Sequence, residues 1–195
     1  MNSLKKKPFF SDIRELRNRA RKHMRQGAVT EDYNADRETV INILNEALAT
    51  ELVCVLRYKR HYFMADGIDA EAVSKEFLQH ADEEQGHADQ IAKRIIQLGG
   101  EPDFSPDEMA LRSHAEYVEG DDLEEMIQED LVAERIAIES YREIIRYLGD
   151  HDPTTRRMLE DILAVEEEHA DDMAGLLRSC TSNQHQQSRS ATGAG

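Results

Sequence analysis

Residues 77–91 read FLQHADEEQGHADQI. If this stretch is helical, Phe77, Glu84, His87 and Ile91 lie on one face, because residues three or four positions apart share a side of a helix. The large apolar side chains mark this face as the one that enters a core, yet an acid and a histidine stand at its centre. The stretch therefore predicts a long helix with a polar site in the middle of its buried face.

Three further segments repeat this design. Each has an apolar stripe at helical spacing, and one glutamate interrupts each stripe near its middle: Glu51, Glu134 and Glu166. Together with the first stretch they predict four helices, at about residues 37–65, 69–98, 121–149 and 152–178. At 1.5 Å per residue, each helix is about 40 Å long. Helices of this length favour a bundle over a mixed fold.

The connections indicate how these helices pair. About three residues join the first helix to the second and the third to the fourth, so each pair is predicted to form an antiparallel hairpin. About 22 residues separate the second helix from the third, with room for a short helix near 106–111. This spacing predicts an all-α four-helix bundle with a long crossover between helices two and three.

Residues 34–178 are predicted to form this single domain. The basic residues 1–33 form a partly disordered N-terminal arm, and the polar residues 179–195 form a disordered tail. Local signals mark two helix starts. Asp121 and Glu124 resemble a capping box before the third helix, and Asp152 precedes Pro153 at the start of the fourth.

The four interrupting glutamates are predicted to converge at one depth in the bundle. Four carboxylates in an apolar interior require cations or protons, and two divalent ions balance their charge. Two of the glutamates are followed at the third position by a histidine, which shares their helix face. Oxygen-rich ligation with one imidazole per metal suits Fe²⁺, with Mn²⁺ as an alternative. The predicted catalytic and metal-binding residues are Glu51, Glu84, His87, Glu134, Glu166 and His169.

The sequence leaves more than one role possible for several side chains near these six. Tyr58 lies two turns after Glu51, and it either packs in the core or hydrogen-bonds to a metal ligand. His80 shares the stripe of the second helix and is predicted to be partly buried beside the site. Three acids adjoin the ligands in sequence and are predicted to face solvent, with iron entry or mineral nucleation as the alternative: Glu83, Glu167 and Glu168.

Charge is distributed unevenly along the chain. The formal net charge is −16, yet residues 1–26 carry nine Lys and Arg against two acids. The acidic body suits cation handling, whereas the basic arm either docks on the protein itself or binds nucleic acid without sequence preference. No apolar run approaches the roughly 18 residues of a membrane span. The two cysteines show neither metal spacing nor a disulfide framework, which predicts a cytoplasmic protein.

Several motifs resemble those of bacterioferritins. These are VINILNEAL at 40–48 with ELV at 51–53, EQGHAD at 84–89, DLEEM at 122–126 with LVAE at 131–134, and EEEH at 166–169. The resemblance covers about residues 37–178 and all six ligand positions. It implies a ferroxidase centre with two iron ions per subunit, oxidation by O₂ or H₂O₂, and a hollow homo-oligomeric shell that stores ferric mineral. In bacterioferritins a methionine follows the second-helix glutamate and binds haem; Gln85 stands at this position, so haem is not expected.

The chain also resembles the Dps-like mini-ferritins, which have twelve subunits where bacterioferritins have twenty-four. A polar tail is expected where bacterioferritins have a short fifth helix, and GDHDP at 149–153 is similar to archaeal-type Dps-like proteins. The expected function is iron storage and detoxification. The alternatives are a Dps-like protector that binds DNA through the basic arm, and a rubrerythrin-like di-iron peroxidase, although the Cys-x-x-Cys module of rubrerythrins is absent.

Overall fold

A computed structural model describes residues 12–67 and 70–192, with side chains described as far as Cys180. Four long helices make up most of this part: α2 (Arg37–Met64), α3 (Ala70–Gln97), α5 (Leu123–Leu148) and α6 (Pro153–Thr192). Short helices lie before them, α1 (Ile13–Arg19) and a 3₁₀ turn at Met24–Gln26, and α4 (Met109–Arg112) lies in the crossover. The first eleven residues of the predicted basic arm lie outside the described residues.

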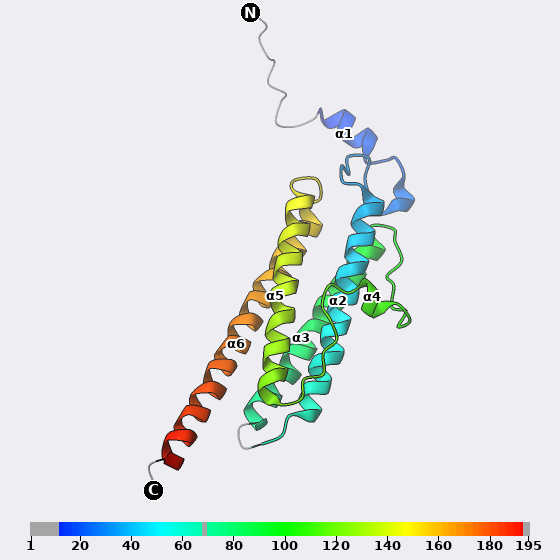
Figure 1. Cartoon of the computed structure of the whole chain (residues 1–195). Coiled ribbons are helices and arrows are strands. Elements are labelled where there is room, and N and C mark those ends of the chain that lie inside the picture. Colours follow the sequence, from blue (N-terminus) through cyan, green and yellow to red (C-terminus); the bar gives the residue numbers. More distant parts are fainter. Residues whose placement is uncertain (1–11, 68–69, 193–195) are drawn as a thin grey trace, which may run out of the picture.

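The helices pair as two hairpins, α2 with α3 and α5 with α6 (Figure 1). The segment from α3 to α5 runs along α2 and carries α4 beside it. The described residues contain no strand. The predicted all-α, ferritin-like four-helix bundle with its long crossover is therefore confirmed.

Side-chain caps explain where the helices begin. The Asp36 side chain caps α2, and Asp152 Oδ1 accepts from Thr155 N at 2.9 Å at the start of α6, as predicted. The predicted capping box before α5 is displaced by one residue. Asp122 is the N-cap and accepts from Glu125 N, while the Glu125 carboxylate accepts from Asp121 N. An N-cap side chain bonds to the backbone N–H of the third helical residue. Because α5 begins at Leu123, this pairing joins Asp122 to Glu125.

Helix α6 is longer than its predicted end near Arg178. It continues to Thr192, through most of the segment that composition predicts to be a disordered tail. Residues 176–192 contain neither glycine nor proline, so no backbone signal ends the helix before Gly193.

Two apolar clusters fill the bundle on either side of its centre. One packs the α2–α3 loop end of the bundle, around Tyr58, Phe77, Ile127 and Met173. The larger cluster packs the other end, with Leu44, Leu48, Ile91, Ile95, Tyr141, Leu148, Leu159 and Ile162. The interrupting glutamates occupy the helix positions between these two clusters. The core therefore encloses the polar centre from both ends.

Helix α2 is the main apolar helix of the described part of the chain. It is the only described helix that is long and apolar enough to cross a membrane. Its apolar residues Leu44, Leu48 and Val53 are buried against the other helices. Its composition is thus that of a core helix.

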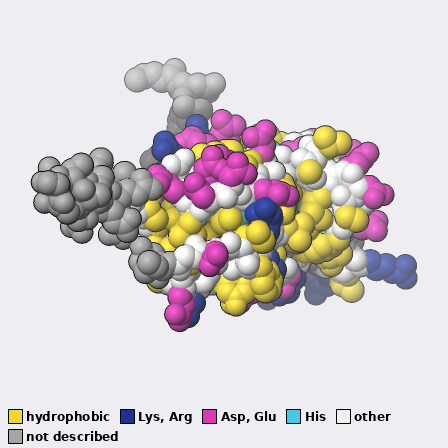
Figure 2. Space-filling view, turned by 60° about the horizontal axis from the view of Figure 1, so that its bottom comes forward, with side chains coloured by type: hydrophobic (Ala, Val, Ile, Leu, Met, Phe, Trp, Pro, Cys, Tyr) yellow, Lys and Arg dark blue, Asp and Glu magenta, His cyan; other side chains and the backbone are white. Residues whose placement is uncertain are grey.

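Large apolar side chains also remain on the surface of this single subunit. Phe63 is 79% exposed at the end of α2, and Leu56, Met64, Ile96 and Val132 are each at least half exposed. Figure 2 shows hydrophobic side chains gathered in patches between acidic ones on the face that it displays. Exposed apolar surface of this kind is typical of an interaction surface when it is contiguous.

A buried ionic network ties the crossover to the bundle. Arg57 Nε donates to Asp130 Oδ1 at 2.8 Å, and His61 Nδ1 lies 2.8 Å from Asp130 Oδ2. Arg57 also donates to the carbonyl of Glu116, and His61 Nε2 lies 3.1 Å from the carbonyl of Glu119. Arg57, His61 and Asp130 are each no more than 1% exposed. The network therefore fixes the end of the crossover against α2 and α5.

We expect Asp130→Ala to lower the free energy of unfolding by about 3–5 kcal/mol, because it leaves the Arg57 guanidinium buried without its carboxylate. Thermal and urea unfolding of the purified variant measure this loss. The matched control is Glu129→Ala, one residue earlier and partly exposed, which should change stability by less than about 0.5 kcal/mol. Equal midpoints for the two variants would show that the network does not stabilise the bundle.

Candidate di-metal site

The four interrupting glutamates meet at the centre of the bundle, one from each long helix. Glu51 lies on α2, Glu84 on α3, Glu134 on α5 and Glu166 on α6, and each is 1% exposed. Each helix turns its apolar stripe inward, so the glutamate within the stripe is carried to the bundle axis. His87 and His169 lie one turn after Glu84 and Glu166 and join them there.

The six side chains form two overlapping groups of ligand-type atoms. Within each group these atoms lie no more than 4.8 Å apart. Glu51 and His87 belong to the first group, and Glu134 and His169 belong to the second. Glu84 and Glu166 belong to both. The arrangement offers two adjacent positions for cations, with Glu84 and Glu166 placed to bridge them.

The chemistry of the donor atoms fits two divalent cations. Among the six residues of the site, five buried atoms have no hydrogen-bond partner: Glu51 Oε2, Glu84 Oε1, both carboxylate oxygens of Glu166, and His169 Nδ1. His87 Nδ1 is 2.9 Å from Glu166 Oε1, but the contact is not aligned as a hydrogen bond. Buried carboxylate oxygens without partners are costly, and a bound cation removes that cost. The residues present therefore suit a di-metal centre.

In the metal-free protein, bound protons neutralise part of the negative charge of the four carboxylates. Burial raises the pKa of Glu51 to about 8, and the nearby charge of Glu84 adds to the shift. Burial likewise raises the pKa of Glu166, together with the charges of Glu84 and Glu51. For Glu84 burial acts in the same direction, but the nearby imidazoles of His169 and His87 outweigh it and lower the pKa.

The pKa values of both histidines are raised, against the effect of burial. Burial lowers the pKa of His169, yet contacts with Glu134 and Glu84 outweigh it and raise the pKa to about 11. The pKa of His87 is raised as well, because Glu166, Glu51 and Glu84 together outweigh the burial effect. Cation binding must displace these protons, so metal affinity depends on pH.

Two buried tyrosines hold carboxylates of the opposite hairpin. Tyr58 on α2 donates to Glu134 on α5, and Tyr141 on α5 donates to Glu51 on α2. The hydrogen bond of Tyr58 to one of the six residues is one of its two expected roles. The matching role of Tyr141 was missed, because its place in the apolar stripe predicts only packing. The available signal was its spacing, since each tyrosine follows its own helix's glutamate by seven residues.

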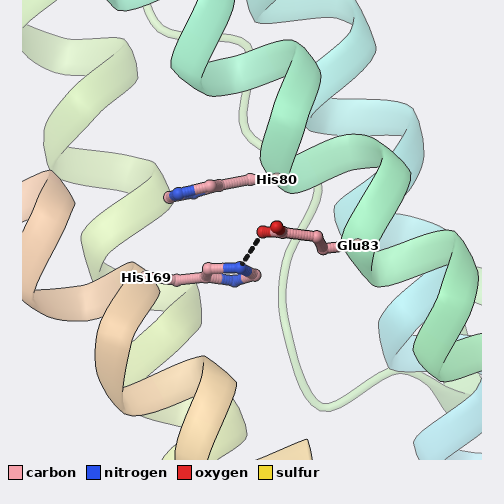
Figure 3. Close-up of side chains that lie close together, drawn as sticks. All are labelled: His80, Glu83 and His169. Atoms are coloured by element: carbon pink, nitrogen blue, oxygen red, sulfur yellow. Dashed lines mark hydrogen bonds and ion pairs between the residues drawn. The ribbon is translucent and has the colours of Figure 1, made fainter.

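Glu83 corrects the prediction that it faces solvent. Its Oε2 accepts from His169 Nε2 at 2.7 Å (Figure 3), although the Glu83 side chain is 40% exposed. Helices α3 and α6 lie side by side here, so the partly exposed Glu83 side chain also faces α6. A carboxylate that holds one ring nitrogen of a histidine orients the other nitrogen toward a metal. Glu83 therefore directs His169 Nδ1 at the centre.

His80 is fully buried beside the same histidine. The His80 and His169 rings stack on each other (Figure 3), and their centroids are 3.9 Å apart. His80 Nδ1 lies 3.2 Å from the Tyr58 hydroxyl. Burial lowers the pKa of His80, and the neighbouring His169 adds to this effect.

A cavity of about 330 Å³ between α3 and α6 leads to this region. Its lining includes His87 and His169 of the site and the acidic residues Glu83, Glu168 and Asp172. Glu168 therefore lines a route to the centre, which agrees with the alternative of iron entry. An acidic entrance raises the local concentration of cations.

The fold and site agree with a known family. The family model described as a ferritin-like domain matches residues 41–182. The chain belongs to the ferritin-like family. A bacterioferritin from Rhodobacter capsulatus is 30% identical over 134 residues, which cover 68% of this chain and 78% of the relative.

Solved structures give the same result. A bacterioferritin-related protein from Bacteroides fragilis, described as a dodecameric thioferritin, aligns with a TM-score of 0.75 and 31% identity over 78% of this chain and 92% of its own. The bacterioferritin of Desulfovibrio desulfuricans, with its diiron site, aligns with a TM-score of 0.67 and 25% identity over 75% and 82%. This chain is a ferritin-like di-iron protein related to bacterioferritins, and its buried carboxylate and histidine clusters are consistent with a di-iron site.

Gln85, at the position where bacterioferritins have the haem methionine, is exposed on α3 and donates to Asp89 at 3.2 Å. That haem is not bound at this position stays a prediction.

Proposed function

We propose that this protein is a ferroxidase that oxidises Fe²⁺ at the centre formed by Glu51, Glu84, His87, Glu134, Glu166 and His169, and that it stores the Fe³⁺ within a shell of its own copies. The convergence of buried ligand atoms without partners on two adjacent positions carries the proposal. Such a site binds two Fe²⁺ as substrate and holds both next to one oxidant. Mn²⁺ is the alternative cation for the same oxygen-rich ligands.

Two Fe²⁺ ions bound side by side supply two electrons to one oxidant molecule. Two Fe²⁺ and O₂, with two protons, give two Fe³⁺ and H₂O₂; with H₂O₂ as oxidant and two protons, they give two Fe³⁺ and two waters. The oxidant thus receives two electrons in either case. Glu84 and Glu166 hold the two ions together, Tyr58 and Tyr141 hold the outer carboxylates in place, and Glu83 keeps the His169 ring oriented.

Shell assembly is supported by two observations. Large apolar side chains such as Phe63, Leu56 and Val132 are exposed on the single subunit, where contact with another copy would bury them. The related protein from Bacteroides fragilis is described as dodecameric. A shell of either twelve or twenty-four subunits fits the proposal.

The deciding experiment combines particle mass with iron retention. Light scattering gives the mass of the purified protein before and after Fe²⁺ is added in air, while ultraviolet absorbance follows the ferric product. We expect a large, closed particle that oxidises Fe²⁺ and keeps many irons per subunit. A small oligomer that keeps only two irons per subunit would contradict storage and favour a di-iron peroxidase.

A DNA-binding role for the basic arm is a second candidate, favoured by the nine Lys and Arg among residues 1–26. Part of the described arm turns back on acids of the chain itself, with Lys22 2.8 Å from Glu31 and Arg19 3.1 Å from Asp32. If the arm binds DNA, gel retardation should weaken steeply with salt and disappear when residues 1–26 are deleted. Absence of retardation at low salt would remove this role.

A further inference from the structure

A second group of ligand-type side chains lies beside the di-metal site, between α3 and α6. Glu76 and His80 lie one turn apart on α3, and Asp172 faces them from α6. His80 Nε2 is 3.6 Å from Glu76 Oε1 and 3.7 Å from Asp172 Oδ2. None of the three belongs to the six residues of the di-metal site.

The hydrogen bonds of His80 determine which of its nitrogens is available. The single hydroxyl proton of Tyr58 is donated to Glu134, so the phenol oxygen accepts a hydrogen bond from His80 Nδ1. This leaves the lone pair on Nε2. The Nε2 atom is buried and has no hydrogen-bond partner, and His80 as a whole is 0% exposed.

This lone pair lies near two carboxylates, which is unfavourable unless a cation lies between them. The distances of 3.6 and 3.7 Å are too long for hydrogen bonds. They are close to the separation of about 3.0–3.6 Å between two ligand atoms that each lie about 2.1 Å from one ion. A buried imidazole held by a second residue, with two carboxylates around its free nitrogen, is the composition of a metal site.

We propose that Glu76, His80 and Asp172 form a third divalent-cation site, which receives Fe²⁺ before it enters the di-metal centre. The Glu76 and Asp172 side chains are 32% and 45% exposed, so a cation reaches them from solvent. Asp172 also lines the cavity that holds His87 and His169, which joins the two sites. Binding at the third site stands on its own geometry, whereas the relay role rests on the proposed ferroxidase function.

The first test counts and locates cations in the full-length protein under anaerobic conditions, with Co²⁺ alone as the probe. We expect the wild type to bind three Co²⁺ per subunit, and the double variant Glu76→Gln with Asp172→Asn to lose one. In crystals soaked with Co²⁺, an anomalous peak should lie within bonding distance of His80 Nε2. The matched control is Glu71→Gln with Asp171→Asn, two exposed acids on the same two helices, which should keep all three ions.

Two results would overturn the third site. One is a wild type in which Co²⁺ occupies only the di-metal centre. The other is a Glu76→Gln, Asp172→Asn variant that keeps the peak at His80. Circular dichroism of the variant verifies that the bundle is folded, and both substitutions change only exposed or partly exposed acids.

A second test addresses the relay. At Fe²⁺ concentrations below one per subunit, the double variant should oxidise Fe²⁺ several-fold more slowly, whereas the control pair should match the wild type. Equal initial rates would overturn the relay. If the wild type itself does not oxidise Fe²⁺, the proposed function fails, while the Co²⁺ count still decides whether the third site exists.

Discussion

Glu134→Ala abolishes rapid Fe²⁺ oxidation and leaves the helices intact: this is the largest effect that we expect from a single substitution. Glu134 is one of the two carboxylates that belong to only one cation position, and it shares that position with His169. Removing it leaves the second Fe²⁺ with bridging carboxylates and one imidazole. One of the two Fe²⁺ ions that supply the two electrons is then no longer held in place. The rate should fall by at least about 100-fold, the upper end of what loss of even an outer-shell partner of a metal costs.

Stopped-flow measurement of Fe²⁺ oxidation in air gives this rate, and circular dichroism verifies the fold. The matched control is Glu139→Ala on the same helix, where the side chain is exposed and pairs with Arg142 at 3.3 Å. This control should oxidise Fe²⁺ at the wild-type rate. A folded Glu134→Ala protein with near-normal activity would refute the assignment of the centre.

Metal removal should produce the second large effect, on stability. Cations bind the folded bundle and not the unfolded chain, so each occupied position adds about 2.7 kcal/mol when the free cation is at 100 times its dissociation constant. We expect the midpoint of thermal unfolding to rise when anaerobic Co²⁺ is added to the metal-free protein, and to fall again with a chelator. Glu166→Gln should suppress most of this rise, because Glu166 belongs to both cation positions.

The control is Glu167→Gln, the next residue on α6, which is exposed and pairs with Arg142 at the surface. It should respond to Co²⁺ as the wild type does. A Glu166→Gln protein with an undiminished rise in the midpoint would show that Co²⁺ stabilises the fold from somewhere other than the di-metal centre.

The same experiment should depend on pH. Because the pKa of Glu51 is raised to about 8, the folded metal-free protein keeps a proton that the unfolded chain loses above about 4.5. The pKa of His169 is raised to about 11, so the folded protein also keeps this proton, which the unfolded chain loses above about pH 6.5. The folded state thus binds more protons, and metal-free stability falls as pH rises through these windows. The gain in unfolding midpoint on adding Co²⁺ should therefore be larger at pH 8 than at pH 6, and an equal gain at both would contradict this proton balance.

The amino-acid sequence by itself determined which face of each long helix is buried and which six residues lie on those faces near the helix centres. Helical periodicity assigns each residue to a face, so an acid such as Glu51 or Glu134 within an apolar stripe must point inward wherever the helix packs. The start of α6 was equally local, since Asp152 caps it with its own side chain. Such features depend on neighbours within one or two turns, and the sequence lists those neighbours directly.

Only the tertiary structure decided which helices face each other beside the centre. Glu83 lies next to Glu84 in sequence and was predicted to face solvent, but the approach of α6 places it against His169. Tyr141 hydrogen-bonds across to Glu51, and Asp172 meets His80, because two hairpins pack in one rotation and not another. Periodicity shows which face of a helix is buried, whereas contacts between helices depend on their rotation and offset, which packing of the whole bundle sets.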